Sequence, residues 1–430
     1  MKIKLLSVCF ILLFGSFVSF AQIVEIEEIE FNYLPMPPAS SMVGSDENEE
    51  QGLWLKVKAI LSARDLKDDT IRMKTTMNAI IPQLGPMNLA ANLIDDEGRL
   101  FPLKSQIVHQ AGVQPSENYQ LFKIVVPNKK KVKFSITYNT VGDFFVYNTN
   151  SDFLSYHSKH GYFYPMDVPI KKVHFDFTLN NNDSLKYFAS YRKFGEIIED
   201  INIAVINKKR YIEESIVKNN LKVNIFVPDT LINGNTWIRK REKLDPYFDR
   251  LASYVADTTS LDVILINWRD EKYRHTNGEG LGSYCVCDIK FPAEGILHEL
   301  LHLTFPSKVL DFSKGEYFIK ESIIEWLTVF LSNKPINKIT TTKLPQIKDS
   351  ISLYDAQINN YTTWDLIYKT GPSIIQYIAG KCGEEKMAKT IISFLEKNQK
   401  EVVDYEKFID HLRVYLSHDL VKELDEMVKM

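Results

Sequence analysis

The sequence His-Glu-Leu-Leu-His at residues 298–302 is the part of the chain best suited to metal chemistry. On a helix, residues four apart lie on the same face, so the two histidine side chains point the same way. Two imidazoles on one face can hold a zinc ion, and the glutamate between them can act as a general base towards water. The spacing therefore predicts one Zn²⁺ ion bound by His298 and His302, with Glu299 as the catalytic base.

A catalytic zinc ion needs a third protein ligand and an open position for water. A third histidine six residues after the second is excluded, because Phe305 and Lys308 stand where this version of the motif has Gly and His. Residues 317–331 have helical apolar spacing and carry Glu321 and Glu325 on one face, where burying a carboxylate is costly without a partner. We expect Glu321 to be the third ligand and Glu325 to accept a hydrogen bond from a ligand histidine.

The elements that must position these side chains change in type along the chain. Residues 22–228 contain short alternating segments that predict a β-rich domain, and residues 122–126 and 132–138 are typical of a hairpin. Residues 229–333 combine helical spacing with a buried strand and form the expected zinc-binding catalytic region. Residues 334–430 predict a helical C-terminal part of the same domain. The fold class expected from these patterns is α+β.

The first 21 residues have the features of a secretory signal peptide. Lys2 and Lys4 precede a short apolar run, which ends in Ser-Phe-Ala at residues 19–21. We expect cleavage near Ala21 and a secreted or periplasmic protein. No later segment reaches the roughly 20 apolar residues of a membrane helix, so no stable span is expected after cleavage.

The composition limits the partners and the cross-links of the chain. The 430 residues carry a formal net charge of −3, so no dominant basic field exists to bind nucleic acid. Of the four cysteines, Cys285, Cys287 and Cys382 lie beyond the signal peptide. The first two stand two apart in a strand-like run and cannot readily pair with each other. At most one disulfide is possible, between Cys382 and either of them. The oligomeric state is left open.

The zinc motif and the residues downstream of it resemble those of a known peptidase group. His298, His302 and, after eighteen intervening residues, Glu321 are similar to the ligand set of the gluzincin metallopeptidases of the membrane alanyl aminopeptidase family. The glycyl aminopeptidase family is a near relative. Ile-Tyr-Lys-Thr-Gly at residues 367–371 looks like the Tyr-Glu-Lys-Gly segment of that family. Gly278-Glu279-Gly280 is the nearest counterpart of its substrate-binding Gly-Ala-Met-Glu-Asn segment.

The resemblance implies a fold, an activity and further site residues. An N-terminal antiparallel β-sandwich-like domain would precede a thermolysin-like catalytic domain with a helical C-terminal part. Tyr368 would stabilise the oxyanion, and Glu279 would bind the free amino group of a peptide or protein substrate. The expected function is that of a secreted zinc-dependent aminopeptidase. Two alternatives are an endopeptidase of the same fold and a non-catalytic peptide-binding relative.

Overall fold

The structure of the chain is a computed structural model. The described residues are 23–35, 53–66, 69–76, 87–110, 119–127, 131–140, 153–157, 164–165, 168–176, 185–194, 197–232, 234–266, 278–280, 283–305, 308–309, 313–334, 351–356, 361–399 and 401–430. The expected signal peptide, residues 1–21, lies outside these ranges. Within them, no helix combines the length and the apolar character needed to cross a membrane.

The chain divides into two compact units. Unit 1 consists of Met1–Phe145, Ser155–Asp183 and Glu196–Ile201. Unit 2 consists of Val146–Leu154, Ser184–Gly195 and Asn202–Met430. All the residues expected to bind zinc or to act in catalysis belong to unit 2.

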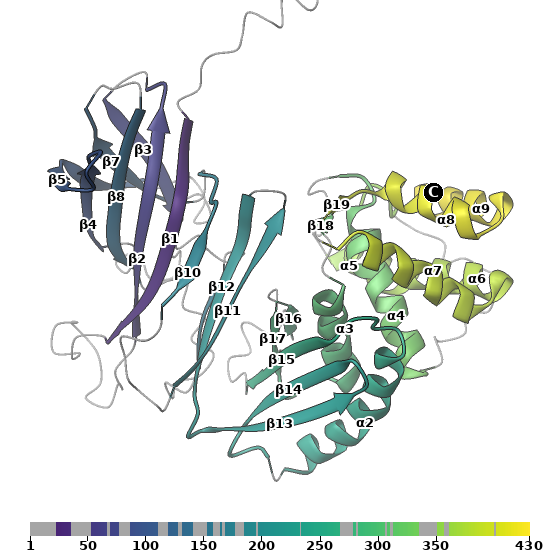
Figure 1. The fold of residues 1–430 in the computed structure, drawn as a ribbon. Coiled ribbons are helices and arrows are strands. Elements are labelled where there is room, and N and C mark those ends of the chain that lie inside the picture. Colours follow the sequence, from purple (N-terminus) through teal and green to yellow (C-terminus); the bar gives the residue numbers. More distant parts are fainter. Residues whose placement is uncertain are drawn as a thin grey trace, which may run out of the picture. The chain divides into compact units, whose positions relative to one another are not determined.

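Unit 1 is built around two β-sheets (Figure 1). In spatial order, the larger sheet contains Val173–Phe175 (β10), Ile23–Pro35 (β1), Leu53–Arg64 (β2), Lys131–Thr140 (β8), Met87–Ile94 (β4) and Leu100–Leu103 (β5). The smaller sheet contains Thr70–Thr76 (β3), Tyr119–Val125 (β7) and Ser105–Gln110 (β6). Neighbouring strands are antiparallel except for β1 and β10.

Alternating burial gives these sheets apolar faces that meet. Along β2, Leu55 and Val57 are fully buried, whereas Lys58 is exposed, as the two-residue period of a strand requires. The ring of Phe122 on β7 meets the ring of Tyr138 on β8 edge to face, with centroids 4.9 Å apart. The hairpin predicted from these two strands is wrong. Strand β7 pairs with β3 and β6, and β8 pairs with β2 and β4, so the two pack against each other from different sheets.

Unit 2 contains a mixed five-stranded sheet. Its order is Tyr211–Lys218 (β13), Leu221–Pro228 (β14), Thr259–Ile266 (β15), Tyr284–Asp288 (β17) and Gly278–Gly280 (β16). Strand β17 is buried along its whole length, as is typical of a strand covered on both faces. The sequence pattern placed the end of the β-rich domain at residue 228, but β13 and β14 lie in unit 2. The reason is that β14 pairs in parallel with β15.

Two helices cover one face of this sheet. Helix α2 (Asn235–Ala252) and helix α3 (Ala293–Thr304) share one apolar core with the sheet. From the strands, this core includes Val223 and Val263, and from α2 it includes Phe248, all fully buried. The sheet therefore forms the base on which α3, the helix of the zinc motif, is held.

The C-terminal part of unit 2 is helical, as predicted (Figure 1). Its helices and π-helical turns are Phe318–Ser322 (η5), Ile323–Ser332 (α4), Tyr361–Asp365 (α5), Leu366–Thr370 (η6), Gly371–Cys382 (α6), Glu384–Lys397 (α7), Tyr405–Tyr415 (α8) and His418–Lys429 (α9). Two further sheets complete the described structure. A three-stranded sheet contains Leu185–Phe194 (β11), Ile197–Asn207 (β12) and Phe153–His157 (β9), and a two-stranded sheet contains Lys308–Val309 (β18) and Val402–Val403 (β19). The protein has an α+β fold.

The three cysteines among the described residues are free thiols. Cys285 and Cys287 are fully buried on β17, with their sulfur atoms 3.9 Å apart, and Cys382 is half-buried at the end of α6. The bridge that the sequence left open between Cys382 and one of the other two is not formed. Unit 2 is therefore held together by packing.

Candidate metal centre

Helix α3 presents the two histidines of the motif on one face. Pro292 caps its start with extended backbone (φ −60°, ψ 156°), and Glu294 in the first turn interacts favourably with the helix dipole. A row of fully buried residues anchors the helix: Ile296, Leu297, Leu300 and Leu301. With that face held against the core, His298 and His302 lie one turn apart on the side that faces α4.

Glu321 lies in the π-helical turn η5, which leads into α4. The N–H of Ile323 donates to the carbonyl of Phe318, five residues back instead of the four of an α-helix. The sequence predicted a regular helix over residues 317–331, so the π-helical turn is an unpredicted feature of its first part. Helix α4 packs against α3, and the Glu321 carboxylate, with a side chain only 14% exposed, reaches both histidines.

The donor atoms of these three residues have the separations that a zinc ion requires. His302 Nε2 lies 3.2 Å from His298 Nε2, and Glu321 Oε2 lies 3.3 Å from His298 Nε2 and 3.6 Å from His302 Nε2. A tetrahedral zinc ion with bonds of about 2.0–2.1 Å holds its ligand atoms about 3.3–3.4 Å apart. Among the described residues, His298, His302 and Glu321 form a group of three side chains whose donor atoms could hold one metal ion. The donor set fits zinc in both atom type and spacing.

Charge in the site is arranged around His298. Burial alone would lower the pKa of this histidine, but the carboxylates of Glu321 and Glu325 raise it to about 10. Burial would likewise raise the pKa of Glu321, but the two histidines hold it well below the ordinary value. Anionic oxygen thus surrounds the point where the imidazole nitrogens meet. A buried cation at that point would be stabilised by the same carboxylates.

Glu325 contacts the other nitrogen of the same imidazole. Its Oε2 lies 3.0 Å from His298 Nδ1, and its side chain is 31% exposed. A carboxylate in this place accepts the Nδ1–H of the ring and so leaves Nε2 free to bind a metal ion. The two glutamates of the second helix therefore act on the two different nitrogens of one histidine.

Replacing Glu325 by glutamine is expected to weaken zinc binding by about 10- to 100-fold, because the tautomer of His298 is then less firmly fixed. Competition with a chromogenic chelator measures this affinity. Glu294→Gln is the comparison variant, because the carboxylate of Glu294 contacts Tyr247 and Lys334 and not a histidine of the motif. Equal zinc affinities for Glu325→Gln and the unmodified protein would contradict the role of Glu325.

Tyr368 brings a hydroxyl group to the candidate metal ligands from a second π-helical turn, η6. Its O–H donates to Glu321 Oε2 at 2.9 Å, and its ring centroid lies 6.2 Å from that of His298. Burial, followed by the charge of Glu321, raises the pKa of Tyr368 above its ordinary value. The phenol is therefore protonated at neutral pH and able to donate a hydrogen bond.

The sequence analysis missed Trp364, which stacks on Tyr368. The two rings are 4.6 Å apart and inclined by 24°, and Trp364 is 42% exposed. Such a stack restricts the tyrosine ring to one orientation. The spacing of four residues within a helical segment was the available signal, because it places the two rings on one face.

Glu299 lies on α3 between the two histidines and is partly buried. The negative charge of Glu299 helps to raise the pKa of both His298 and Tyr368. Its contribution is smaller than those of burial and of the contacts with Glu321. Its carboxylate therefore lies in the same electrostatic environment as these two groups. The helix thus brings the expected base to the candidate metal centre.

Glu279 lies on β16, the edge strand of the five-stranded sheet. Strand β16 runs antiparallel to β17, with Glu279 opposite Val286, and its backbone lies near α3. The structure describes the backbone of this strand. It thus places the backbone of Glu279 on an edge strand beside the helix of the zinc motif.

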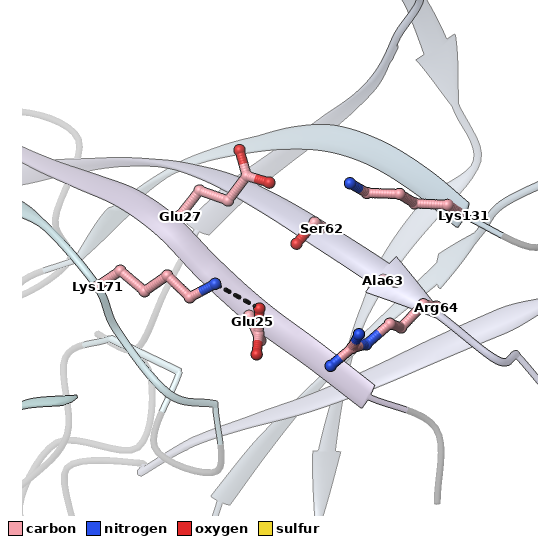
Figure 2. Close-up of a pocket in the computed structure, with 7 residues that line it drawn as sticks. All are labelled: Glu25, Glu27, Ser62, Ala63, Arg64, Lys131 and Lys171. Carbon is pink, nitrogen blue, oxygen red and sulfur yellow. Dashed lines mark hydrogen bonds and ion pairs between the residues drawn. The ribbon is translucent and has the colours of Figure 1, made fainter. Parts of the chain in front are cut away.

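A separate hollow of about 310 Å³ lies in unit 1 and contains none of these residues (Figure 2). It is lined by Glu25, Glu27, Ser62, Ala63, Arg64, Lys131 and Lys171. Figure 2 shows the ion pair between Lys171 and Glu25, whose N–O distance is 2.7 Å. Some of the charged side chains around it are thus paired with one another. The residues that line it include no histidine and no cysteine.

Compared by sequence, the chain matches no protein-family profile and no curated protein. Compared by structure, it is similar to the M1 zinc metallopeptidase from Deinococcus radiodurans, with a TM-score of 0.51, 12% identity and 94% of each chain covered. A mutant M1 zinc metallopeptidase from that organism, bound to a Tyr-Ser-Ala substrate, gives a TM-score of 0.50 at 12% identity, covering 95% of this chain and 94% of that chain. A two-domain M1 zinc metallopeptidase mutant bound to L-arginine gives a TM-score of 0.51 at the same identity and coverage.

At this level of identity, the likeness shows a shared fold. The chain has the fold of the M1 zinc metallopeptidases, which are gluzincins, and the likeness extends over nearly the whole of both chains. The backbone thus agrees with the fold that the resemblance of the zinc motif implied. The likeness does not distinguish the membrane alanyl aminopeptidase family from the glycyl aminopeptidase family.

Proposed function

We propose that the protein is a zinc metallopeptidase that hydrolyses peptide bonds, and that its specific activity is that of an aminopeptidase. The observation that carries this proposal is the meeting of His298, His302 and Glu321, whose donor atoms have the spacing of zinc ligands. The presence of Glu299 and Tyr368 beside them supports catalysis rather than a purely structural metal. The fold shared with M1 zinc metallopeptidases, one of them bound to a tripeptide substrate, agrees with it.

The chemistry of the site follows from the groups that the chain supplies. His298, His302 and Glu321 would hold a zinc ion, which polarises a carbonyl group and lowers the pKa of water when it is bound. Glu299 takes a proton from the attacking water and delivers it to the leaving amine. Tyr368, kept protonated by its surroundings, donates a hydrogen bond to the oxyanion of the tetrahedral intermediate. Peptide hydrolysis requires these roles, and each has a residue.

The aminopeptidase activity and the location are finer parts of the same proposal. A free amino group of the substrate would bind to Glu279, whose strand lies at the edge of the sheet beside α3. We place the catalytic part among the thermolysin-like domains on the basis of the motif. The first 21 residues would direct export and be removed near Ala21, which N-terminal sequencing of the exported protein tests.

The zinc-loaded protein is expected to cleave peptides with a free amino terminus and to leave N-acetylated versions of the same peptides intact, since the acetyl group removes the charge that Glu279 would bind. Mass spectrometry of matched peptide pairs, with and without chelator, measures this. Glu279→Gln is expected to weaken binding of the free peptides, whereas Glu294→Gln, whose carboxylate contacts Tyr247 and Lys334, should not.

Each other outcome of this experiment identifies one of the alternatives. Cleavage of acetylated peptides at internal bonds indicates an endopeptidase of the same fold. Binding of peptides by the zinc-loaded protein without any turnover indicates a non-catalytic peptide-binding protein. Cleavage that persists after complete removal of zinc contradicts the proposal as a whole.

A further inference from the structure

The π-helical turn η6 changes the hydrogen bonding of the backbone directly before Tyr368. The N–H of Gly371 donates to the carbonyl of Leu366, five residues back, whereas an α-helix would direct it to Ile367, four back. The next residue in the chain, Pro372, has no N–H to donate. The carbonyl of Ile367 therefore needs a partner from outside its own helix.

Ser322 supplies that partner. Its hydroxyl donates to the carbonyl oxygen of Ile367 at 2.6 Å, and its side chain is fully buried. A hydroxyl on a helix commonly bonds to the carbonyl four residues back, as Thr328 does to Ile324 at 2.8 Å on the same helix. Ser322 instead crosses to another helix.

The bond joins the neighbours of two functional residues. Ser322 directly follows Glu321, the expected zinc ligand, and Ile367 directly precedes Tyr368. The hydroxyl of Tyr368 in turn donates to Glu321 Oε2 at 2.9 Å. Two hydrogen bonds thus connect the two π-helical turns. One joins the Ser322 hydroxyl to the Ile367 carbonyl, and the other joins the Tyr368 hydroxyl to the Glu321 carboxylate.

Gly371 makes room for this contact. A Cβ atom at Gly371 would lie 2.1 Å from the Ser322 hydroxyl oxygen and 2.5 Å from its Cβ. The backbone of Gly371 is ordinary helical backbone (φ −56°), so glycine is needed here for close approach rather than for its conformation. Ser322 and the adjacent pair Gly371 and Pro372 therefore serve one contact.

We propose that Ser322 is a positioning residue for the reaction, acting through the carbonyl of Ile367 to hold the Tyr368 hydroxyl at the metal centre. This inference rests on the proposed peptidase function. Loss of the hydroxyl leaves the buried carbonyl of Ile367 without its partner, so η6 shifts to find another. Tyr368 moves with η6, whereas the zinc ligands on α3 and η5 stay in place.

The test is a double-mutant cycle between Ser322→Ala and Tyr368→Phe. Ser322→Ala is expected to lower kcat about tenfold on a peptide substrate, with KM and zinc content nearly unchanged, because misplacement of one catalytic group affects the chemical step. In the Tyr368→Phe background, the same substitution is expected to have little further effect. Equal losses of kcat in the two backgrounds would overturn the proposal, as would a loss of zinc.

Two comparison variants separate positioning from general destabilisation. Ser332→Ala removes a hydroxyl that bonds to Val329 within the same helix at 3.1 Å, so it is expected to leave kcat unchanged. Gly371→Ala keeps the Ser322 hydroxyl, but the added Cβ would press on both the hydroxyl oxygen and the Cβ of Ser322, so it is expected to lower kcat at least as much as Ser322→Ala does. An unchanged kcat in Gly371→Ala would argue against the role of this contact.

Backbone amide exchange provides a readout that does not depend on activity. In Ser322→Ala, exchange is expected to quicken in peptides covering η6, whereas in Ser332→Ala it is expected to stay unchanged there. Unchanged exchange at η6 would overturn the proposed link. If the unmodified zinc-loaded protein cleaves no peptide, the peptidase proposal fails, while the exchange experiment still tests the link between the two turns.

Discussion

Replacing Glu299 by glutamine is expected to lower kcat about a thousandfold while the protein still binds an equimolar amount of zinc. A general base contributes about 10²- to 10⁴-fold to a rate, and the amide of glutamine cannot accept a proton from water. Glutamine keeps the size of the side chain, and Glu299 is not one of the three residues that meet at the metal centre. Steady-state kinetics on an unblocked peptide, together with metal analysis of the same samples, measure both quantities.

Glu294→Gln is the matched comparison for this variant. Glu294 lies on the same helix, is also partly buried, and contacts Tyr247 and Lys334 instead of the metal ligands. It is expected to keep its kcat, with at most a modest fall in thermal stability. Substantial turnover by Glu299→Gln, or an equal loss of kcat in both variants, would contradict the role of Glu299 as the base.

The second large effect is expected from Glu321→Gln, which should lower zinc affinity more than about 100-fold and abolish turnover. Changes to residues that only support a ligand cost about 10- to 100-fold, so loss of the charged ligand itself should cost more. Zinc binding to the folded state also raises the thermal midpoint, by an amount that grows with the logarithm of the zinc affinity. The shift seen in the unmodified protein on addition of zinc should therefore be absent in Glu321→Gln.

Comparing Glu325→Gln with Glu321→Gln shows which of the two carboxylates contributes more to zinc affinity. Both side chains contact His298, but only Glu321 lies within reach of His302 as well. The zinc-induced shift in thermal midpoint should therefore be reduced in Glu325→Gln and lost in Glu321→Gln. The reverse order would mean that Glu325, and not Glu321, is the third ligand.

Much of the candidate site follows from local spacing. The positions of His298 and His302 one turn apart required only that residues 293–304 form a helix, and Pro292 and the apolar row made that prediction possible. Glu321 required a judgement about burial, because a carboxylate on an otherwise apolar helix needs a partner. Tyr368 depended on a resemblance, since no local pattern distinguishes one tyrosine from another.

The features that were not predicted depend on contacts between distant segments. The strands at residues 122–126 and 132–138 have the pattern of a hairpin, but their choice of partners was decided by the packing of two sheets. The parallel pairing of β14 with β15 groups β14 with unit 2, and the residue pattern of neither strand alone predicts this pairing. The contact between Ser322 and Ile367 joins residues that are 45 apart in the sequence.

The two π-helical turns have a consequence for insertions and deletions. A π-helical turn holds one residue more than the α-helical turn that it replaces, and each residue of an α-helix rotates the chain by about 100°. Deleting one residue from Leu366–Thr370 would restore a regular helix that still forms. It would also rotate Tyr368 relative to the residues that follow it, and a similar deletion in Phe318–Ser322 would rotate Glu321. A deletion that leaves both helices intact would thus separate the hydroxyl from the metal ligands.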